Sequence, residues 1–162
     1  MASYRLINGY VYDDGKLERR DVMKMSSDDL EDIVTLDCEH CYILPGMIDI
    51  HCHLREPGGE HKETIETGSK SAVCGGFTTI CPMPNTNPTP DSAIVLEQII
   101  NRAKEDNLCN ILPFSSVTKG EKGETLVDFK SQLEAGAIAF SDDGMPVENA
   151  AMIRQAMLEA NK

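Results

Sequence analysis

Short apolar segments, predicted to be β-strands, recur along this sequence about once every 30 residues, each followed by a stretch with helical periodicity. They begin near residues 47, 77, 110 and 137. Short apolar strands that alternate with helices are typical of a parallel sheet covered by helices. Residues 45–162 are therefore predicted to form four β-α units of an α/β fold.

Helices are expected over about 62–74, from Asp91 onward, before Gly136, and over about 148–160. Asp91 is a good N-cap for the second of these helices. Its apolar residues recur at the i, i+3, i+4, i+7 spacing that places them on one face: Leu96, Ile99, Ile100 and Ala103. Gly75-Gly76 is the predicted end of the first helix.

Four β-α units fit two architectures. One is an open doubly wound sheet, and the other is the first half of a TIM-type (β/α)8 barrel. A complete barrel needs roughly 200 to more than 400 residues, so this chain of 162 residues cannot close one. We expect the chain to be the front half of a longer protein.

Residues 1–44 are predicted to form a small β region instead. Residues 4–12 favour a strand pair bent at Asn8-Gly9, or one strand with a bulge, and Asp13-Asp14-Gly15 is typical of a turn. This region has too little apolar material for an independent core. We therefore divide the chain into an N-terminal β region, 1–44, and an α/β region, 45–162.

The chain carries 27 acidic and 15 basic residues, a net charge of −12. Without clustered Lys and Arg, this balance argues against nucleic acid as a partner. No apolar run approaches the roughly 18 residues of a membrane span, and the N-terminus has no signal-peptide core. With no export signal, the six cysteines favour a reducing cytoplasm.

Cys38-Glu-His-Cys41 allows three interpretations: half of a structural zinc site, a redox pair, or two thiols that flank a turn between short strands. No second cysteine pair follows, which favours the turn. His40 and His61 do not stand at strand ends, and we expect both on the surface.

His51 and His53 follow the first apolar strand, Met47–Ile50, which is predicted to be buried. Because side chains on a strand alternate with period two, the two imidazoles point to the same side, together with Asp49. Two imidazoles at the carboxyl end of a strand provide half of a divalent-metal site. Arg55 suits bidentate capture of a substrate carboxylate, or else forms an ion pair with Glu56 or Glu60.

Polar residues also follow the second and fourth strands. Asn85, in a loop stiffened by three prolines, offers both a donor and an acceptor to a polar ligand, or it is simply a turn former. In Ser141-Asp-Asp-Gly144, the acids suit metal ligation or base catalysis, but they equally suit capping of the next helix.

Four blocks together resemble the dihydroorotase family of the amidohydrolase superfamily, in matching order and spacing over 40–160. They are Asp49-Ile-His-Cys-His-Leu-Arg-Glu-Pro-Gly58, Gly75-Gly-Phe-Thr-Thr79, Met83-Pro-Asn-Thr86 with Pro88, and Phe140-Ser-Asp-Asp-Gly144. The resemblance implies a metal-dependent hydrolase barrel, truncated in this chain. Residues 4–44 are similar to the family's N-terminal β region, part of a small β-sandwich domain.

The resemblance further implies zinc-dependent interconversion of L-dihydroorotate and N-carbamoyl-L-aspartate in pyrimidine synthesis. By matching motif, His51 and His53 would bind the first of one or two zinc ions, and Asp143 would bridge two metals. Arg55 and Asn85 would hold the substrate carboxylate. Two further histidines and the general-base Asp of the family would lie beyond Lys162, so the resemblance assigns no catalytic residue within this chain.

Two other functions remain open. One is a related cyclic amidohydrolase, similar to hydantoinase or allantoinase. The other is a non-catalytic scaffold that pairs with another pyrimidine enzyme. With an unpaired edge expected beside its fourth strand, the isolated chain is predicted to be poorly stable or self-associating, and inactive as a hydrolase. We expect the protein to form a homo-oligomer or to associate with another enzyme of the pathway.

Overall fold

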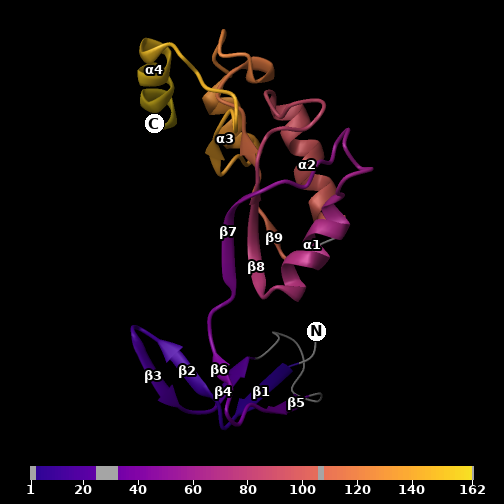
Figure 1. Ribbon diagram of the computed structural model, residues 1–162, viewed down its shortest axis with the longest axis vertical. Helices are drawn as coiled ribbons and strands as arrows, with labels where there is room; N and C mark the ends of the chain where they lie inside the picture. The colour runs from indigo at the N-terminus through magenta and orange to yellow at the C-terminus, as the bar shows by residue number, and fades with distance from the viewer. Residues whose placement is uncertain (1–2, 25–32, 106–107, 162) are drawn as a thin grey trace. The chain divides into compact units, whose positions relative to one another are not determined.

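The computed structural model describes residues 3–24, 33–105 and 108–161. The chain divides into two compact units, Met1–Pro45 and Gly46–Lys162. The first unit consists of strands and turns, whereas the second mixes strands and helices, so the α/β class predicted for the second unit is confirmed (Figure 1). Among the described helices, none has the length and apolar character needed to cross a membrane.

The first unit contains two three-stranded sheets, in the orders β4-β1-β5 and β3-β2-β6. The strands are β1 (Ser3–Ile7), β2 (Tyr10–Asp13), β3 (Lys16–Arg19), β4 (Val22–Lys24), β5 (Ile33–Asp37) and β6 (Tyr42–Ile43). The predicted pairing across Asn8-Gly9 is wrong, since β1 and β2 belong to different sheets. Asn8 adopts a positive φ of 64°, which redirects the chain between them.

Two turns of this unit agree with the sequence. Asp14 and Gly15, with φ of 45° and 75°, join β2 to β3 as the two positive-φ residues of a tight hairpin. The Cys41 N–H donates to the Cys38 carbonyl at 2.9 Å, so the two cysteines flank a turn between β5 and β6. His40 and His61 are exposed, as predicted.

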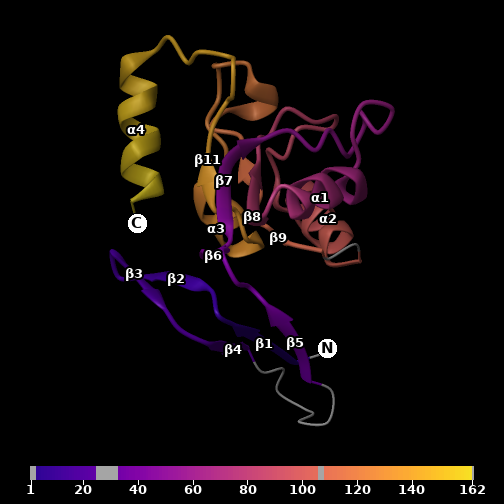
Figure 2. The same ribbon diagram turned by 60° about the horizontal axis from the view of Figure 1, so that its bottom comes forward.

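The second unit is built around a parallel sheet in the order β7-β8-β9 and a parallel pair, β10-β11. Helices α1 and α2 lie on the same side of the three-stranded sheet in both views (Figures 1 and 2). The strands are β7 (Met47–Cys52), β8 (Phe77–Pro82), β9 (Asn110–Ile111), β10 (Phe114–Ser115) and β11 (Ala139–Phe140). The helices are α1 (Ile65–Cys74), α2 (Ala93–Glu105), the 3-10 turn η1 (Lys119–Glu121), α3 (Phe129–Ala135) and α4 (Ala150–Ala160).

The apolar stripe of α2 is buried as predicted, with Leu96, Ile99 and Ala103 in the interior. Ile99 and Ala103 pack with residues of α1, β8, the loop after β7 and the segment just before β9: Leu54, Ile65, Ile80 and Cys109 complete this core cluster. A smaller cluster joins α3 to α4 through Val127, Phe129 and Ala156. These two clusters hold the helices against the strands whose ends carry the polar loops.

The strand predicted to begin near 110 is interrupted at Pro113, which has no N–H to donate. On one side, the Leu112 N–H donates to the Ile80 carbonyl of β8 at 3.0 Å. On the other, the Pro113 carbonyl accepts the Ile138 N–H at 3.1 Å. The chain thus pairs first with β8, through β9, and then with β11, through β10.

Two expectations for this unit are wrong. Asp91 is not the N-cap of α2, because its carboxylate accepts the Gly120 N–H at 2.9 Å and the helix begins at Ala93. The apolar residues of β7 are not buried either: Ile48 is 62% exposed and Ile50 is 71% exposed. Within the described residues β7 pairs with β8 alone, so at this edge of the sheet fewer neighbouring side chains cover the faces on which Ile48 and Ile50 lie.

Candidate metal centre

His51 and His53 lie at the carboxyl end of β7, where the sequence places them. Their rings meet edge to face, with centroids 5.3 Å apart. The register of β7 against β8 shifts between Asp49 and Cys52. Within this irregular stretch the His51 N–H donates to the Asp49 carboxylate at 3.0 Å. The Asp49 carboxylate therefore bonds to the backbone of its own strand, while the two imidazoles lie together at the end of that strand.

Asp143 comes from the loop after β11 and reaches the same place. Its Oδ1 lies 3.2 Å from His51 Nε2. One potential ligand atom from each of His51, His53 and Asp143 lies within 4.8 Å of the other two. The Asp143 side chain is 18% exposed and that of His51 is 58% exposed, so the group opens to solvent on the His51 side.

The structure separates the two acids that the sequence leaves equivalent. Asp142 is buried, and its carboxylate accepts the N–H groups of Val117 and Thr118, at 2.8 and 3.0 Å. It also accepts the Thr118 hydroxyl at 2.5 Å. With its oxygens occupied in this way, Asp142 holds the loop, and neither acid caps α4, whose N-cap is Asn149.

Asp143 is turned the other way by its backbone. Its φ of 47° lies in the left-handed region, which non-glycine residues adopt rarely and often at functional sites. The Ser141 hydroxyl accepts the Asp143 N–H at 2.9 Å and fixes this conformation. Neighbouring residues thus send one carboxylate into the protein and the other toward the imidazoles.

Asn85 lies between two members of this group. Its Nδ2 donates to Asp143 Oδ2 at 2.7 Å, and its Oδ1 lies 3.0 Å from His53 Nδ1. The Asn85 loop follows β8, so three polar loops, after β7, β8 and β11, converge at one end of the strands. Asn85 is therefore part of the site and more than a turn former, although the sequence does not predict its contacts with His53 and Asp143.

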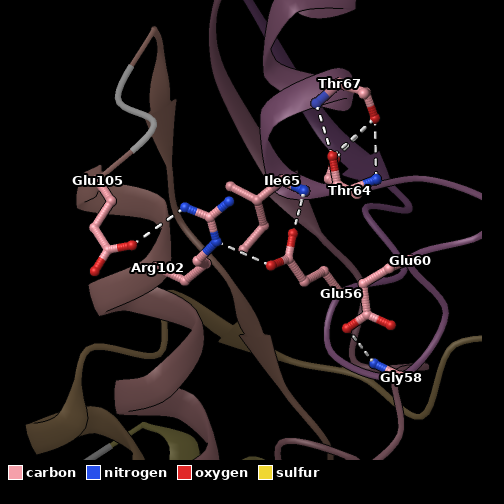
Figure 3. Close-up of polar contacts among 8 residues, drawn as sticks. All are labelled: Glu56, Gly58, Glu60, Thr64, Ile65, Thr67, Arg102 and Glu105. Atoms are coloured by element: carbon pink, nitrogen blue, oxygen red, sulfur yellow. Dashed lines mark hydrogen bonds and ion pairs between the residues drawn. The ribbon is translucent and has the colours of Figure 1, made fainter.

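Arg55 is partly buried and stands at the centre of a tight turn. The Glu56 N–H donates to the Leu54 carbonyl at 2.8 Å, which closes a three-residue γ-turn, and Arg55 has a φ of 59°. The alternative ion pairs with Glu56 and Glu60 do not form. The Glu56 carboxylate instead accepts the Ile65 N–H at 2.7 Å and pairs with Arg102 at 3.0 Å (Figure 3).

The Glu60 carboxylate accepts a hydrogen bond from a nearby backbone group, the Gly58 N–H, at 2.8 Å (Figure 3). No ion pair involving Arg55 occurs within residues 3–24, 33–105 and 108–161. Arg55 follows His53 by two residues in the sequence. Its guanidinium thus remains available to an anionic ligand.

Glu121 is a third carboxyl near the site, and sequence reasoning missed it. Its Oε1 is buried and has no hydrogen-bond partner among the described residues. Burial, and then the negative charges of Asp142 and Asp143, raise the pKa of the Glu121 carboxyl. Glu121 ends η1, between β10 and α3, and no local pattern predicts its proximity to the two acids, which is a tertiary feature.

Cys52 stands between the two histidines in sequence but has a different environment. Burial, followed by the nearby charge of Asp49, raises the pKa of the Cys52 thiol to about 12. The Cys52 side chain packs against the core cluster that contains Leu54, Ile65 and Ile80. The donor group of this site is therefore the two imidazoles and the Asp143 carboxylate, without the intervening cysteine.

This donor group fits a divalent cation. Two neutral imidazoles and one carboxylate are a common ligand set of catalytic zinc, in which the remaining positions stay open to water and substrate. Here the group combines a largely buried carboxylate with a solvent-exposed imidazole. The electrostatics agree, since a cation would offset the negative charges of Asp142, Asp143 and Glu121.

Comparison with known families matches residues 41–162 to the Dihydro-orotase-like family. The chain is 43% identical over 164 residues to a dihydroorotase of Staphylococcus aureus (strain MRSA252), covering 96% of this chain and 39% of that protein. It is 42% identical over 172 residues to a dihydroorotase of Bacillus cereus (strain AH820), covering 99% of this chain and 40% of that protein. The chain thus spans about two fifths of the length of these relatives.

Solved structures show the same fold. The L-hydantoinase (dihydropyrimidinase) of Arthrobacter aurescens superposes with a TM-score of 0.75 at 19% identity, over 99% of this chain and 38% of that one. The D-hydantoinase (dihydropyrimidinase) of a Thermus species superposes with a TM-score of 0.59 at 22% identity, over 81% and 30%. Since the family match extends over most of its residues, the chain belongs to the dihydroorotase-like family.

Proposed function

We propose that this chain forms the metal-binding part of a zinc-dependent dihydroorotase, which interconverts L-dihydroorotate and N-carbamoyl-L-aspartate in pyrimidine synthesis. The proposal is carried by the convergence of His51, His53 and Asp143 from two separate strand ends. Family membership supports the choice of reaction, because the Staphylococcus and Bacillus relatives are dihydroorotases.

His51, His53 and Asp143 would hold zinc, as one ion or as part of a pair. When bound, zinc supplies Lewis acidity, which polarises an amide carbonyl and makes water more acidic. The largely buried Asp143 and the contact it makes with His51 give this group a defined arrangement before any ligand arrives. Such preorganisation lowers the reorganisation needed on binding.

Arg55 would bind the ring carboxylate of dihydroorotate through its guanidinium, which forms two parallel hydrogen bonds to a carboxylate. Asn85 has a second Nδ2 hydrogen beyond the one it gives to Asp143 and would donate it to the same carboxylate. An anion held at a fixed point orients the amide carbonyl relative to the metal ligands, and this reduces the entropy cost of reaction. We assign the general-base role to none of the described residues.

The first test of this function is zinc content. The chain, supplemented with zinc and then dialysed, should retain zinc in elemental analysis, and His51→Ala should lose most of it. His61→Ala is the matched control, since His61 is an exposed histidine outside the group. A wild-type chain that stays free of zinc would contradict the proposal, and a complete gene product that stays free of zinc after the same treatment would favour a non-catalytic scaffold.

The second test is substrate preference. The complete product of the gene that encodes this chain should hydrolyse dihydroorotate in preference to hydantoin and allantoin. Arg55→Gln should mainly raise the KM for dihydroorotate, because it removes the charge that pairs with the ring carboxylate. A preference for the uncharged hydantoin ring would point to a different cyclic amidohydrolase.

A further inference from the structure

We infer that Asn85 is a positioning residue of the metal centre: its amide holds His53 and Asp143 in the orientation that binds the cation. This inference rests on the proposed function and adds to it a role that precedes substrate binding. It comes from one side chain that bridges two ligands belonging to different loops, after β7 and after β11.

The orientation of the Asn85 amide follows from its partners. An ionised carboxylate only accepts hydrogen bonds, so the group that faces Asp143 Oδ2 at 2.7 Å has to be the NH₂. The carbonyl oxygen then faces His53 Nδ1 at 3.0 Å. The network thus leaves a single assignment of the amide oxygen and nitrogen.

This assignment fixes the tautomer of His53. A carbonyl oxygen can only accept, so Nδ1 has to carry the hydrogen, and Nε2 keeps the lone pair that binds a metal. A metal-ligating histidine almost always donates its other ring N–H to an acceptor, usually a carboxylate, a backbone carbonyl or water. In this chain the Asn85 side-chain carbonyl takes that place.

The same amide orients the Asp143 carboxylate. With Oδ2 occupied by Asn85, Oδ1 lies 3.2 Å from His51 Nε2 and is the oxygen on the side of the imidazoles. Without this contact the Asp143 side chain would be free to rotate about its terminal torsion, which is broad for a carboxylate. Asn85 therefore acts on two of the three ligands, and on His51 through Asp143.

Hydrogen bonds of neighbouring residues fix the loop that carries Asn85. The Asn87 N–H donates to the Pro57 carbonyl at 2.9 Å, so the loop of Asn85 is tied to the loop that carries His53 and Arg55. The Thr86 hydroxyl donates to the Pro88 carbonyl at 2.8 Å within the same loop. A side chain on so constrained a backbone is well suited to hold ligands.

The experiment is a zinc titration of the chain by competition with a chromophoric chelator, without substrate, for wild type and Asn85→Leu. Leucine has a similar volume but cannot form either hydrogen bond. We expect the zinc dissociation constant of Asn85→Leu to rise about 10- to 100-fold, the usual effect of losing a partner of a metal ligand. Asn110→Leu is the matched control, because Asn110 donates to Thr79 Oγ1 at 3.2 Å on β8, away from the group.

A second measurement separates positioning from a general loss of structure. ¹⁵N NMR of the imidazoles should show His53 in the Nδ1–H tautomer in the wild-type chain and a mixture of tautomers in Asn85→Leu, before zinc is added. If the wild-type chain binds zinc, and Asn85→Leu has the same zinc affinity and the same His53 tautomer as the wild type, this inference alone is overturned. A wild-type chain that binds no zinc would overturn the proposed function and the inference with it.

Discussion

Asp142 and Asp143 show at the scale of single residues how position decides chemistry. Both are aspartates in one loop, yet Asp142 accepts three hydrogen bonds from the chain and Asp143 faces His51. A buried carboxylate that satisfies three donors stabilises the fold, whereas a carboxylate beside imidazoles is available to a cation. Substitution of Asp142 should therefore affect stability, whereas substitution of Asp143 should affect metal binding.

We predict that Asp142→Ala lowers the free energy of unfolding by about 2–4 kcal/mol, since it leaves three donors without their charged acceptor. Asp143→Ala should lose zinc binding and leave the unfolding free energy nearly unchanged. Chemical denaturation and zinc titration of both variants measure the two effects. Equal loss of stability in both variants would contradict the division of roles.

At the scale of elements, the candidate metal centre depends on loops held close to one another. The loop after β7 is tied to α1 and α2 through Glu56, which contacts the Ile65 N–H and the Arg102 side chain (Figure 3). The same loop approaches the loop of Asn85 at Gly58. Gly58 has a φ of 86°, and a Cβ at this position would lie 2.0 Å from the Asn87 carbonyl oxygen.

Gly58→Ala should therefore separate the two loops. A side chain in the left-handed region costs roughly 1–2 kcal/mol, and the clash with backbone adds to it. We predict a lower melting temperature and weaker zinc binding, because Asn85 moves away from His53. Gly144→Ala is the control, because a Cβ there meets nothing within 4 Å among the described residues, apart from its two neighbours in the chain. Similar behaviour of the two variants would contradict this account.

At the scale of the whole molecule, the second unit has strand edges without partners. Among the described residues β7 pairs only with β8, and β11 pairs only with β10, which agrees with the edge predicted beside the fourth strand. Ile48 and Ile50 on β7 are largely exposed. Unpaired backbone groups next to exposed apolar side chains favour association with another chain.

We predict that the isolated chain self-associates through β7 and that Ile50→Lys shifts it toward the monomer, because a charge on an edge strand opposes pairing. Ile94→Lys is the matched control: Ile94 is 69% exposed but lies on α2. Sedimentation velocity over a range of concentrations measures the change. A wild-type chain that stays monomeric throughout would refute the prediction.

Much of the second unit follows from local sequence. The i, i+3, i+4 spacing predicts the buried face of α2, and Gly75 ends α1 where expected. Local patterns were misleading where neighbours decide burial: Met47–Ile50 is as apolar as a central strand, but it lies at an edge. Asp91 has the side chain of an N-cap, but Gly120 provides its partner.

By itself the sequence determined that two imidazoles stand together at a strand end, because the period of a strand is a local property. Local sequence also named Asn85 and the two acids as candidates, and family resemblance chose Asp143 and gave both residues their roles, but no local pattern separates Asp143 from Asp142 or joins Asn85 to His53. Only the tertiary structure decided these points, since hydrogen bonds between loops distant in the chain depend on how the strands are ordered. The sequence alone determines which chemical groups the chain carries, whereas the packing of its strands and loops decides which of these groups form hydrogen bonds with one another.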